Sequence, residues 1–233
     1  MSSDNYYRQF EREMDVLGRR YGLSRVFNDF LTVSMCSVHQ TNIASRLKEK
    51  DPENEALYMD TIKPYSRNEL SQFGKLLAYL QLCVYQEPYS DLLGQYFTEH
   101  ITKGHNGQFF TPTSVSMLMS QLTASEEPPK GKRVYDPACG SGRLLLEFAK
   151  AAPANFFYAN DVSLTCAKMT SLNFMFNGLR GEVACMNTLS MEWGSGWKVN
   201  TPVLGIVPIE KKSSRIWSAP PEPQSEPQQL TLF

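Results

Sequence analysis

A glycine-containing turn constrains this 233-residue chain more than any other feature. The turn reads Asp-Pro-Ala-Cys-Gly-Ser-Gly at 136–142, follows a short strand-like approach at 133–135 and runs directly into an amphipathic segment at 143–150. Its glycines permit positive φ and close approach of a ligand to the backbone, and the helix start offers amide groups to that ligand. A carboxylate before such a turn suits the ammonium group of a zwitterion. The spacing differs from Gly-x-Gly-x-x-Gly, so a nicotinamide dinucleotide is not favoured.

Strand and helix patterns alternate from residue 133 onward, which favours an α/β fold with a parallel, doubly wound sheet. Right-handed crossovers would then bring the carboxyl ends of the strands to one edge, where ligands bind. The expected elements are strand 133–136, helix 141–150, strand 155–160, helix 163–176, strand 182–186 and a fourth strand at 203–207.

The chain before this region is mainly helical by its apolar spacing. Helices are expected over Tyr6–Arg20, Val26–Ala44 and Glu69–Tyr85, with prolines between them, and a shorter one from Thr111 or Thr113 to Leu122. Their apolar stripes are interpreted as core. Three parts are therefore expected: a helical region at 1–100, an α/β core at 101–217 and a polar, proline-rich tail at 218–233 that reads as a disordered linker.

Composition excludes several classes of function. The net charge is −1, so binding to nucleic acid would need a local basic patch or a partner subunit. The five cysteines, scattered and odd in number, do not look like a disulfide framework, which favours a reducing, cytoplasmic location. The polar start does not look like a signal peptide, and no apolar run is long enough for a membrane span. His39, His100 and His105 have no metal-ligand companions in the sequence, so we expect no metal.

Three motifs in order carry a family resemblance. Asp-Leu-Leu-Gly-Gln-Tyr-Phe at 91–97 and Gly-Gln-Phe-Phe-Thr-Pro at 107–112 precede the turn at 136–142. Together they resemble the adenine-N6 DNA methyltransferases, and among these the modification (methylase) subunits of type I restriction systems. The resemblance implies a Rossmann-like fold that binds S-adenosylmethionine (SAM). It also implies action on DNA, directly or through a specificity subunit.

The resemblance also implies a cofactor site. Asp136 would hold the methionine end of SAM, and Asp161, at the end of the next strand, would accept hydrogen bonds from the ribose, with a helix N-cap as its alternative role. Asn187 stands where the family has Asp, and its carbonyl oxygen can still accept from the adenine amino group. The full expected set is Gln108, Phe109, Phe110, Thr111, Pro112, Asp136, Pro137, Ala138, Cys139, Gly140, Ser141, Gly142, Asp161 and Asn187.

The motif that binds the target base, Asn or Asp followed by Pro-Pro and an aromatic residue, is not found. Asn200 and Pro202 in Asn-Thr-Pro-Val form only a weak remnant, and an ordinary turn is the favoured interpretation. Four expected strands also fall short of the family's seven, so the sheet is either capped by the helical region or completed by another chain, such as a second methylase chain. Catalysis is therefore left open.

The last five residues, Gln-Leu-Thr-Leu-Phe, look like a peptide that binds the bacterial sliding clamp. Its expected contacts are Gln229, Leu230, Leu232 and Phe233. A proline-rich spacer in front of the peptide would give it reach. The alternative to a methyltransferase is thus a non-catalytic, methylase-like adaptor that this peptide recruits to the replication clamp.

Overall fold

The computed structural model describes residues 3–39, 51–102, 129–201 and 204–218. Its amino-terminal part is helical: α1 (Ser3–Tyr21), α2 (Leu23–Ser37), α3 (Pro52–Ile62), α4 (Arg67–Gln86), α5 (Leu92–Tyr96) and the π-helix η1 (Phe97–Thr102). These helices share a core of fully buried side chains that includes Phe10, Phe27, Phe30, Leu76 and Tyr96. The apolar spacing seen in the sequence therefore marks core, as expected.

The carboxyl-terminal part is a five-stranded mixed sheet in the order β1-β2-β3-β4-β5. Strands β1, β2 and β3 are parallel, whereas β4 pairs antiparallel with β3 and β5 antiparallel with β4. The elements are β1 (Arg133–Asp136), α7 (Arg143–Ala151), β2 (Phe156–Asp161), α8 (Leu164–Phe176), β3 (Arg180–Asn187), β4 (Glu192–Val199), β5 (Ile206–Pro208), η2 (Lys211–Ser213) and α9 (Arg215–Ser218).

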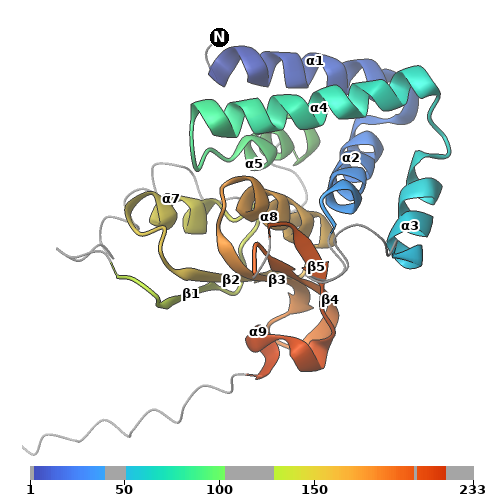
Figure 1. Ribbon diagram of the computed structural model, residues 1–233. Helices are drawn as coiled ribbons and strands as arrows, with labels where there is room; N and C mark the ends of the chain where they lie inside the picture. Colours follow the sequence, from blue (N-terminus) through green and yellow to red (C-terminus); the bar gives the residue numbers. More distant parts are fainter. Residues whose placement is uncertain (1–2, 40–50, 103–128, 202–203, 219–233) are drawn as a thin grey trace, which may run out of the picture.

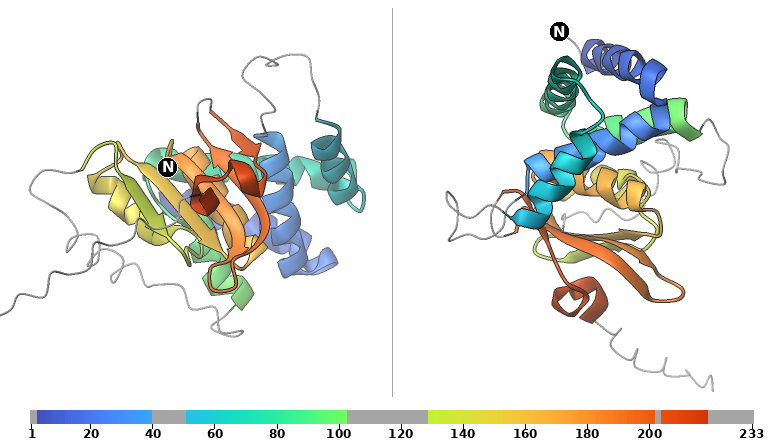
Figure 2. Two further views of the ribbon diagram at one scale, coloured as in Figure 1. Left: turned by 90° about the horizontal axis from the view of Figure 1, so that it is seen from below. Right: turned by 90° about the vertical axis from the view of Figure 1, so that its right-hand side faces the viewer.

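Helices α7 and α8 cover one face of the sheet, and the amino-terminal helices lie over them, as Figures 1 and 2 show. The short helix α9 lies on the opposite face, where its first amide, that of Arg215, donates to the buried Glu182 carboxylate at 2.7 Å. Both crossover helices are on the same side because β1, β2 and β3 follow one another in a single direction. The helical region is thus bound to the face of the sheet that carries the crossover helices.

The expected fold class is confirmed: parallel strands alternate with helices, after a helical region. The parallel strands and crossover helices lie within one or two residues of their expected bounds, and β1 matches them fully. The fourth strand expected at 203–207 is instead β5 at Ile206–Pro208, antiparallel to β4. Strand β4 and helix α3 were not predicted. The residues of the expected helix at 111–122 lie outside the described residues.

The two edges of the sheet differ. At β5, the Ile206 amide donates to the Val38 carbonyl at 3.1 Å, and His39 forms a parallel bridge with Ile206, so the end of α2 adjoins this edge. At β1, only β2 pairs with the strand in the part of the chain that the structure describes. The expectation that the helical region would cap the sheet therefore holds for the β5 edge.

Candidate functional site

The carboxyl ends of the three parallel strands bring three expected site residues to one edge of the sheet. Asp136 ends β1, Asp161 ends β2 and Asn187 ends β3. The register pairs Asp136 with Ala159 and Asp161 with Cys185, so the first two ends are offset by two residues only. In open α/β sheets this edge is where ligands bind.

The turn between β1 and α7 is held by its own backbone. The Ala138 amide donates to Oδ1 of Asp136 at 3.0 Å, and the Gly142 amide donates to the Cys139 carbonyl at 2.8 Å. Gly140 and Gly142 have φ values of 56° and 83°, in the left-handed region that glycine adopts without a Cβ penalty. Helix α7 then begins with no side-chain cap at Gly142, which favours an anionic ligand group at this helix start.

Asp136 has one carboxylate oxygen to offer. Oδ1 accepts from Ala138, whereas Oδ2 accepts no hydrogen bond from the residues that the structure describes. Burial raises the pKa of Asp136, and the negative charge of Asp161 adds to this effect although the Ala138 amide opposes it. Because two carboxylates lie at one edge, a positively charged ligand group would be stabilised between them.

Asp161 connects the two strand ends. Its Oδ2 accepts from the Gly140 amide at 2.9 Å and its Oδ1 accepts from the Ser163 amide at 2.8 Å. The N-cap of α8 is Ser163, whose hydroxyl oxygen accepts from the Cys166 amide, so the alternative role of Asp161 as the N-cap is wrong. A carboxylate oxygen can accept more than one hydrogen bond, which leaves Asp161 capacity for ribose hydroxyls.

Amide side chains complete this edge. Asn160 is fully buried and donates to the Pro137 carbonyl at 3.1 Å and to the Thr188 hydroxyl at 2.6 Å, so it ties the turn to the end of β3. The carbonyl oxygen of Asn187 accepts from the amides of Leu189 and Ser190 at 2.9 and 3.2 Å. A role of Asn187 toward adenine stays a prediction, and Asn160 is a structural residue that the motif comparison did not single out.

A buried carboxylate from the helical region supports the turn from behind. Oδ1 of Asp91 accepts from Gly94 N and Asn173 Nδ2, each at 2.9 Å, and its Oδ2 accepts from Ser141 Oγ at 2.5 Å and Arg143 Nε at 2.9 Å. Burial raises the pKa of Asp91, against the opposing effect of the Arg143 charge and these donors. The motif at 91–97 therefore meets the turn at 136–142 through direct hydrogen bonds.

Packing explains the glycine of that motif. A Cβ atom on Gly94 would lie 2.2 Å from Oδ2 of Asp91 and 2.3 Å from Oγ of Ser141. Any larger residue would therefore push apart the two side chains that join the helical region to the turn. Cys139, in the turn at 136–142, is buried, and this burial raises the pKa of its thiol well above the ordinary value.

Two expected groups of site residues lie outside the described residues. They are the motif residues Gln108, Phe109, Phe110, Thr111 and Pro112, and the tail residues Gln229, Leu230, Leu232 and Phe233. Pro202 of the weak base-binding remnant is also outside.

Asn200 is described, and its side chain holds a turn. Its Nδ2 donates to the carbonyls of Phe174, Met175 and Leu179 at 3.0 to 3.2 Å, and its Oδ1 accepts from the Gly205 amide at 3.2 Å. The residue is buried and has a φ of 50°, which asparagine adopts more readily than most residues. Its amide thus joins the end of α8 to the segment between β4 and β5.

The replacement Asn200→Ala is expected to lower the free energy of unfolding by about 1–3 kcal/mol, because buried carbonyls lose their donor. Urea unfolding followed by circular dichroism measures this change. Asn68→Ala, at an exposed position of α4, is the matched control and should change stability by less than about 0.5 kcal/mol. Equal stability of the two variants would show that the Asn200 amide does not hold the turn.

Comparison with known proteins agrees with this geometry. The family model described as N-6 DNA Methylase matches residues 85–221, more than half of the chain. The chain belongs to the N-6 DNA methylase family. The match includes the motif at 91–97, the turn at 136–142 and all five strands of the sheet. The family resemblance read from the motifs is therefore confirmed.

Curated relatives are methylase subunits of type I restriction enzymes. The MjaVIII subunit of Methanocaldococcus jannaschii is 35% identical over 81 residues, which are 34% of this chain and 14% of that protein. The HindI subunit of Haemophilus influenzae is 28% identical over 153 residues, 56% of this chain and 34% of that protein. The matched regions thus span about a third or less of the length of these relatives.

A solved structure gives a further likeness. The type I restriction-modification methyltransferase subunit from Streptococcus thermophilus aligns with 83% of this chain and 60% of its own, at a TM-score of 0.47 and 16% identity.

None of the described helices combines the length and the apolar character needed to cross a membrane.

Proposed function

We propose that this chain binds SAM at the edge formed by the carboxyl ends of β1 and β2 and serves as the cofactor-binding part of an adenine-N6 DNA methyltransferase of restriction-modification type. The observation that carries the proposal is the placement of Asp136 and Asp161 at one edge, joined through the left-handed glycine turn. Bound there, SAM would supply the methyl group. DNA would be reached directly or through a specificity subunit, in line with the relatives, which are methylase subunits of type I restriction enzymes.

The residues present fit the chemistry of this ligand. Oδ2 of Asp136 is an available acceptor for the ammonium group, and the start of α7 favours the carboxylate of the same amino acid. Asp161 is placed at the end of the neighbouring strand, where an acidic side chain accepts from ribose hydroxyls. The chain's own part is thus to bind and orient the cofactor.

Calorimetric titration of the purified chain with SAM tests this proposal. We expect one site with micromolar affinity, equal to roughly −8 kcal/mol. A chain that is folded by circular dichroism but gives no heat with SAM would contradict the proposal. It would leave the non-catalytic adaptor, a methylase-like scaffold without cofactor, as the better account.

The affinity for SAM is also expected to depend on pH in a defined direction. Because burial raises the pKa of Asp136, this side chain takes up a proton at higher pH than an ordinary carboxyl group. The dissociation constant should therefore be constant above this pKa and rise by about tenfold per pH unit below it, as the charge on Asp136 is lost. Titrations between about pH 4 and 7 measure the profile. Asp136→Asn, which cannot titrate, should flatten it; an unchanged profile in that variant would assign the dependence to another group.

A further inference from the structure

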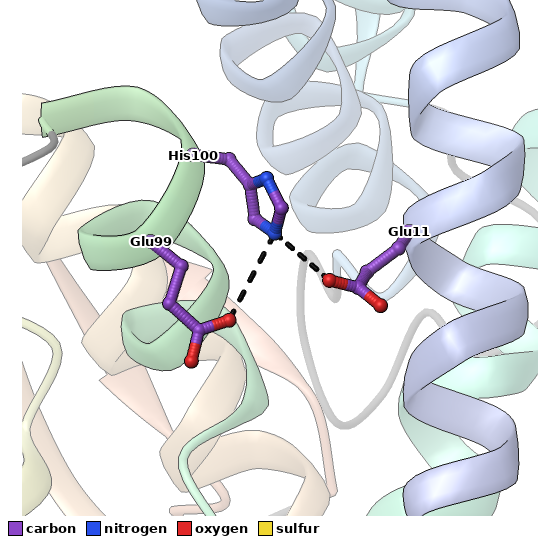
Figure 3. Close-up of side chains that lie close together, drawn as sticks. All are labelled: Glu11, Glu99 and His100. Atoms are coloured by element: carbon purple, nitrogen blue, oxygen red, sulfur yellow. Dashed lines mark hydrogen bonds and ion pairs between the residues drawn. The ribbon is translucent and has the colours of Figure 1, made fainter.

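A second group of polar side chains lies away from the sheet edge, between α1 and η1. Figure 3 shows Glu11 of α1 opposite Glu99 and His100 of η1. Nε2 of His100 lies 2.9 Å from Oε1 of Glu11 and 3.8 Å from Oε2 of Glu99. One ligand atom from each of the three residues falls within 4.8 Å of the other two. Two carboxylates and one imidazole thus converge on one point.

The three side chains are held in place by neighbours. The π-helical turn, a form found frequently at functional sites, presents Glu99 and His100 together toward α1. The His100 ring stacks on Tyr96 at 4.6 Å between centroids. The Tyr7 hydroxyl donates to Oε2 of Glu99, and Gln95 Nε2 donates to Oε1 of Glu99 at 3.1 Å. In metal sites, neighbouring groups orient the carboxylate and imidazole ligands through hydrogen bonds and packing, as they do here.

An unsatisfied hydroxyl lies beside the group. Tyr96, whose ring stacks on His100, is fully buried, and its hydroxyl has no hydrogen-bond partner among the residues that the structure describes. Burial raises the pKa of this hydroxyl, and the charges of Asp15 and Glu11 act in the same direction. The Tyr96 ring also contacts Phe10 of α1, with 5.3 Å between the ring centroids. A buried hydroxyl without a partner is unfavourable. A water molecule on an ion beside Glu11 would provide one.

We propose that Glu11, Glu99 and His100 bind one divalent first-row transition ion, of which Zn²⁺ is the representative. Bonds of about 2.0–2.2 Å from such an ion bring ligand atoms to within about 3–4 Å of each other. The separations of 2.9 and 3.8 Å already meet this, and the Glu99 side chain, 47% exposed, can move to close the rest. Three protein ligands would leave positions for water.

The ligand set argues for this class of ion over others. Mg²⁺ and Ca²⁺ prefer ligand sets made of oxygen alone, whereas imidazole is a common ligand of zinc and of other first-row transition ions. Glu11 and His100 are 89 residues apart in the sequence. The expectation of no metal depended on residues close to each histidine in the sequence, so it did not include this pair. An ion here would join the first helix to the segment that follows the motif at 91–97. We therefore expect binding to stabilise the fold.

The test uses the whole chain, stripped of metal and kept reduced. Calorimetric titration with Zn²⁺ alone should show one equivalent bound, with no heat from Mg²⁺, and Zn²⁺ should raise the melting temperature. Glu99→Gln and Glu11→Gln should each weaken binding by at least about tenfold, since even outer partners of metal ligands are worth 10–100-fold. The Glu99 side chain is about half exposed, so Glu99→Gln is expected to fold even where Glu11→Gln does not.

The matched control is His39→Gln. Nε2 of His39 lies 2.9 Å from Oδ2 of Asp51, a similar pair without a third ligand in the described part of the chain, so its loss should leave Zn²⁺ affinity unchanged. No binding by the folded chain would overturn the proposal. So would equal affinity in Glu99→Gln and the unsubstituted chain, or a thiolate charge-transfer band with Co²⁺, because either would place the ion at other residues.

Discussion

Replacing Asp91 with alanine is expected to lower the free energy of unfolding by about 3–5 kcal/mol, the largest single effect predicted for this chain. The carboxylate is buried, with its side chain 6% exposed, and it accepts from Gly94, Ser141, Arg143 and Asn173. Alanine removes all four acceptor contacts at once. It also takes the negative charge from beside the Arg143 guanidinium, whose side chain is 14% exposed.

The cause of this large effect is the asymmetry of buried polar groups. Formation of a buried ion pair contributes little net stability, because both charges lose their contacts with water. When one partner is removed, the other buried groups stay away from water but no longer have a hydrogen-bond or charge partner. The free energy of unfolding therefore falls by more than the intact pair contributes. For Asp91 the loss also affects the turn, because Ser141 and Arg143 belong to the segment that carries the proposed SAM site.

Urea unfolding of Asp91→Ala measures the change, with Asp60→Ala at an exposed position of α3 as the control. The control should differ from the unsubstituted chain by less than about 0.5 kcal/mol. A second variant, Asp91→Asn, keeps the shape and an acceptor oxygen, so it should lie between the two. If Asp91→Ala has the same free energy of unfolding as the control, the helical region and the turn at 136–142 are held together by their apolar contacts alone.

The parallel half of the sheet could be predicted because its signals are local. Strand β1, the turn at 136–142 and helix α7 follow one another within 19 residues, from Arg133 to Ala151. Glycines mark the turn, and the helix shows the apolar spacing of an amphipathic helix. Asp136 and Asp161 were likewise predictable, because the ends of parallel strands must share one edge. The positions of these residues needed no knowledge of distant contacts.

Strand β4 was missed because its sequence contradicts strand propensity. Residues Gly194 and Gly196 weaken a strand interior and read as a loop. The fold gives a reason for Gly196: a Cβ there would lie 2.5 Å from the Trp193 ring, so the indole occupies that space. Helix α3 was missed because Pro52 reads as punctuation, whereas here it lies in the first turn behind the N-cap Asp51.

Contacts between distant segments were beyond the reach of periodicity. The bond from Asn173 to Asp91 joins residues 82 apart, and that from His100 to Glu11 joins residues 89 apart. The motif at 91–97 was recognised as a pattern, but what it does became clear only from its contacts with Ser141 and Arg143. Local pattern therefore located the edge of the sheet at which we propose that SAM binds, and the fold alone shows which contacts support that edge.

Replacing Asp136 with alanine is expected to weaken SAM binding at least about 30-fold, equal to about 2 kcal/mol. The reason is that Oδ2 would face the ammonium group with no competing donor among the described residues, at an edge where Asp161 adds negative potential. Loss of a charge from a partly desolvated pair costs more than the loss of an exposed one. This prediction depends on the proposed SAM site.

Asp136→Asn separates the charge from the fold. Its carbonyl oxygen can still accept from the Ala138 amide, so the turn is retained while the charge is lost. We expect it to bind SAM more weakly than the unsubstituted chain, whereas Glu192→Gln, an exposed carboxylate at the start of β4, should bind within about twofold of it. Calorimetric titration at neutral pH compares the three. If Asp136→Asn binds as tightly as Glu192→Gln, the carboxylate is not the partner of the ammonium group, and the backbone of the turn must carry the affinity.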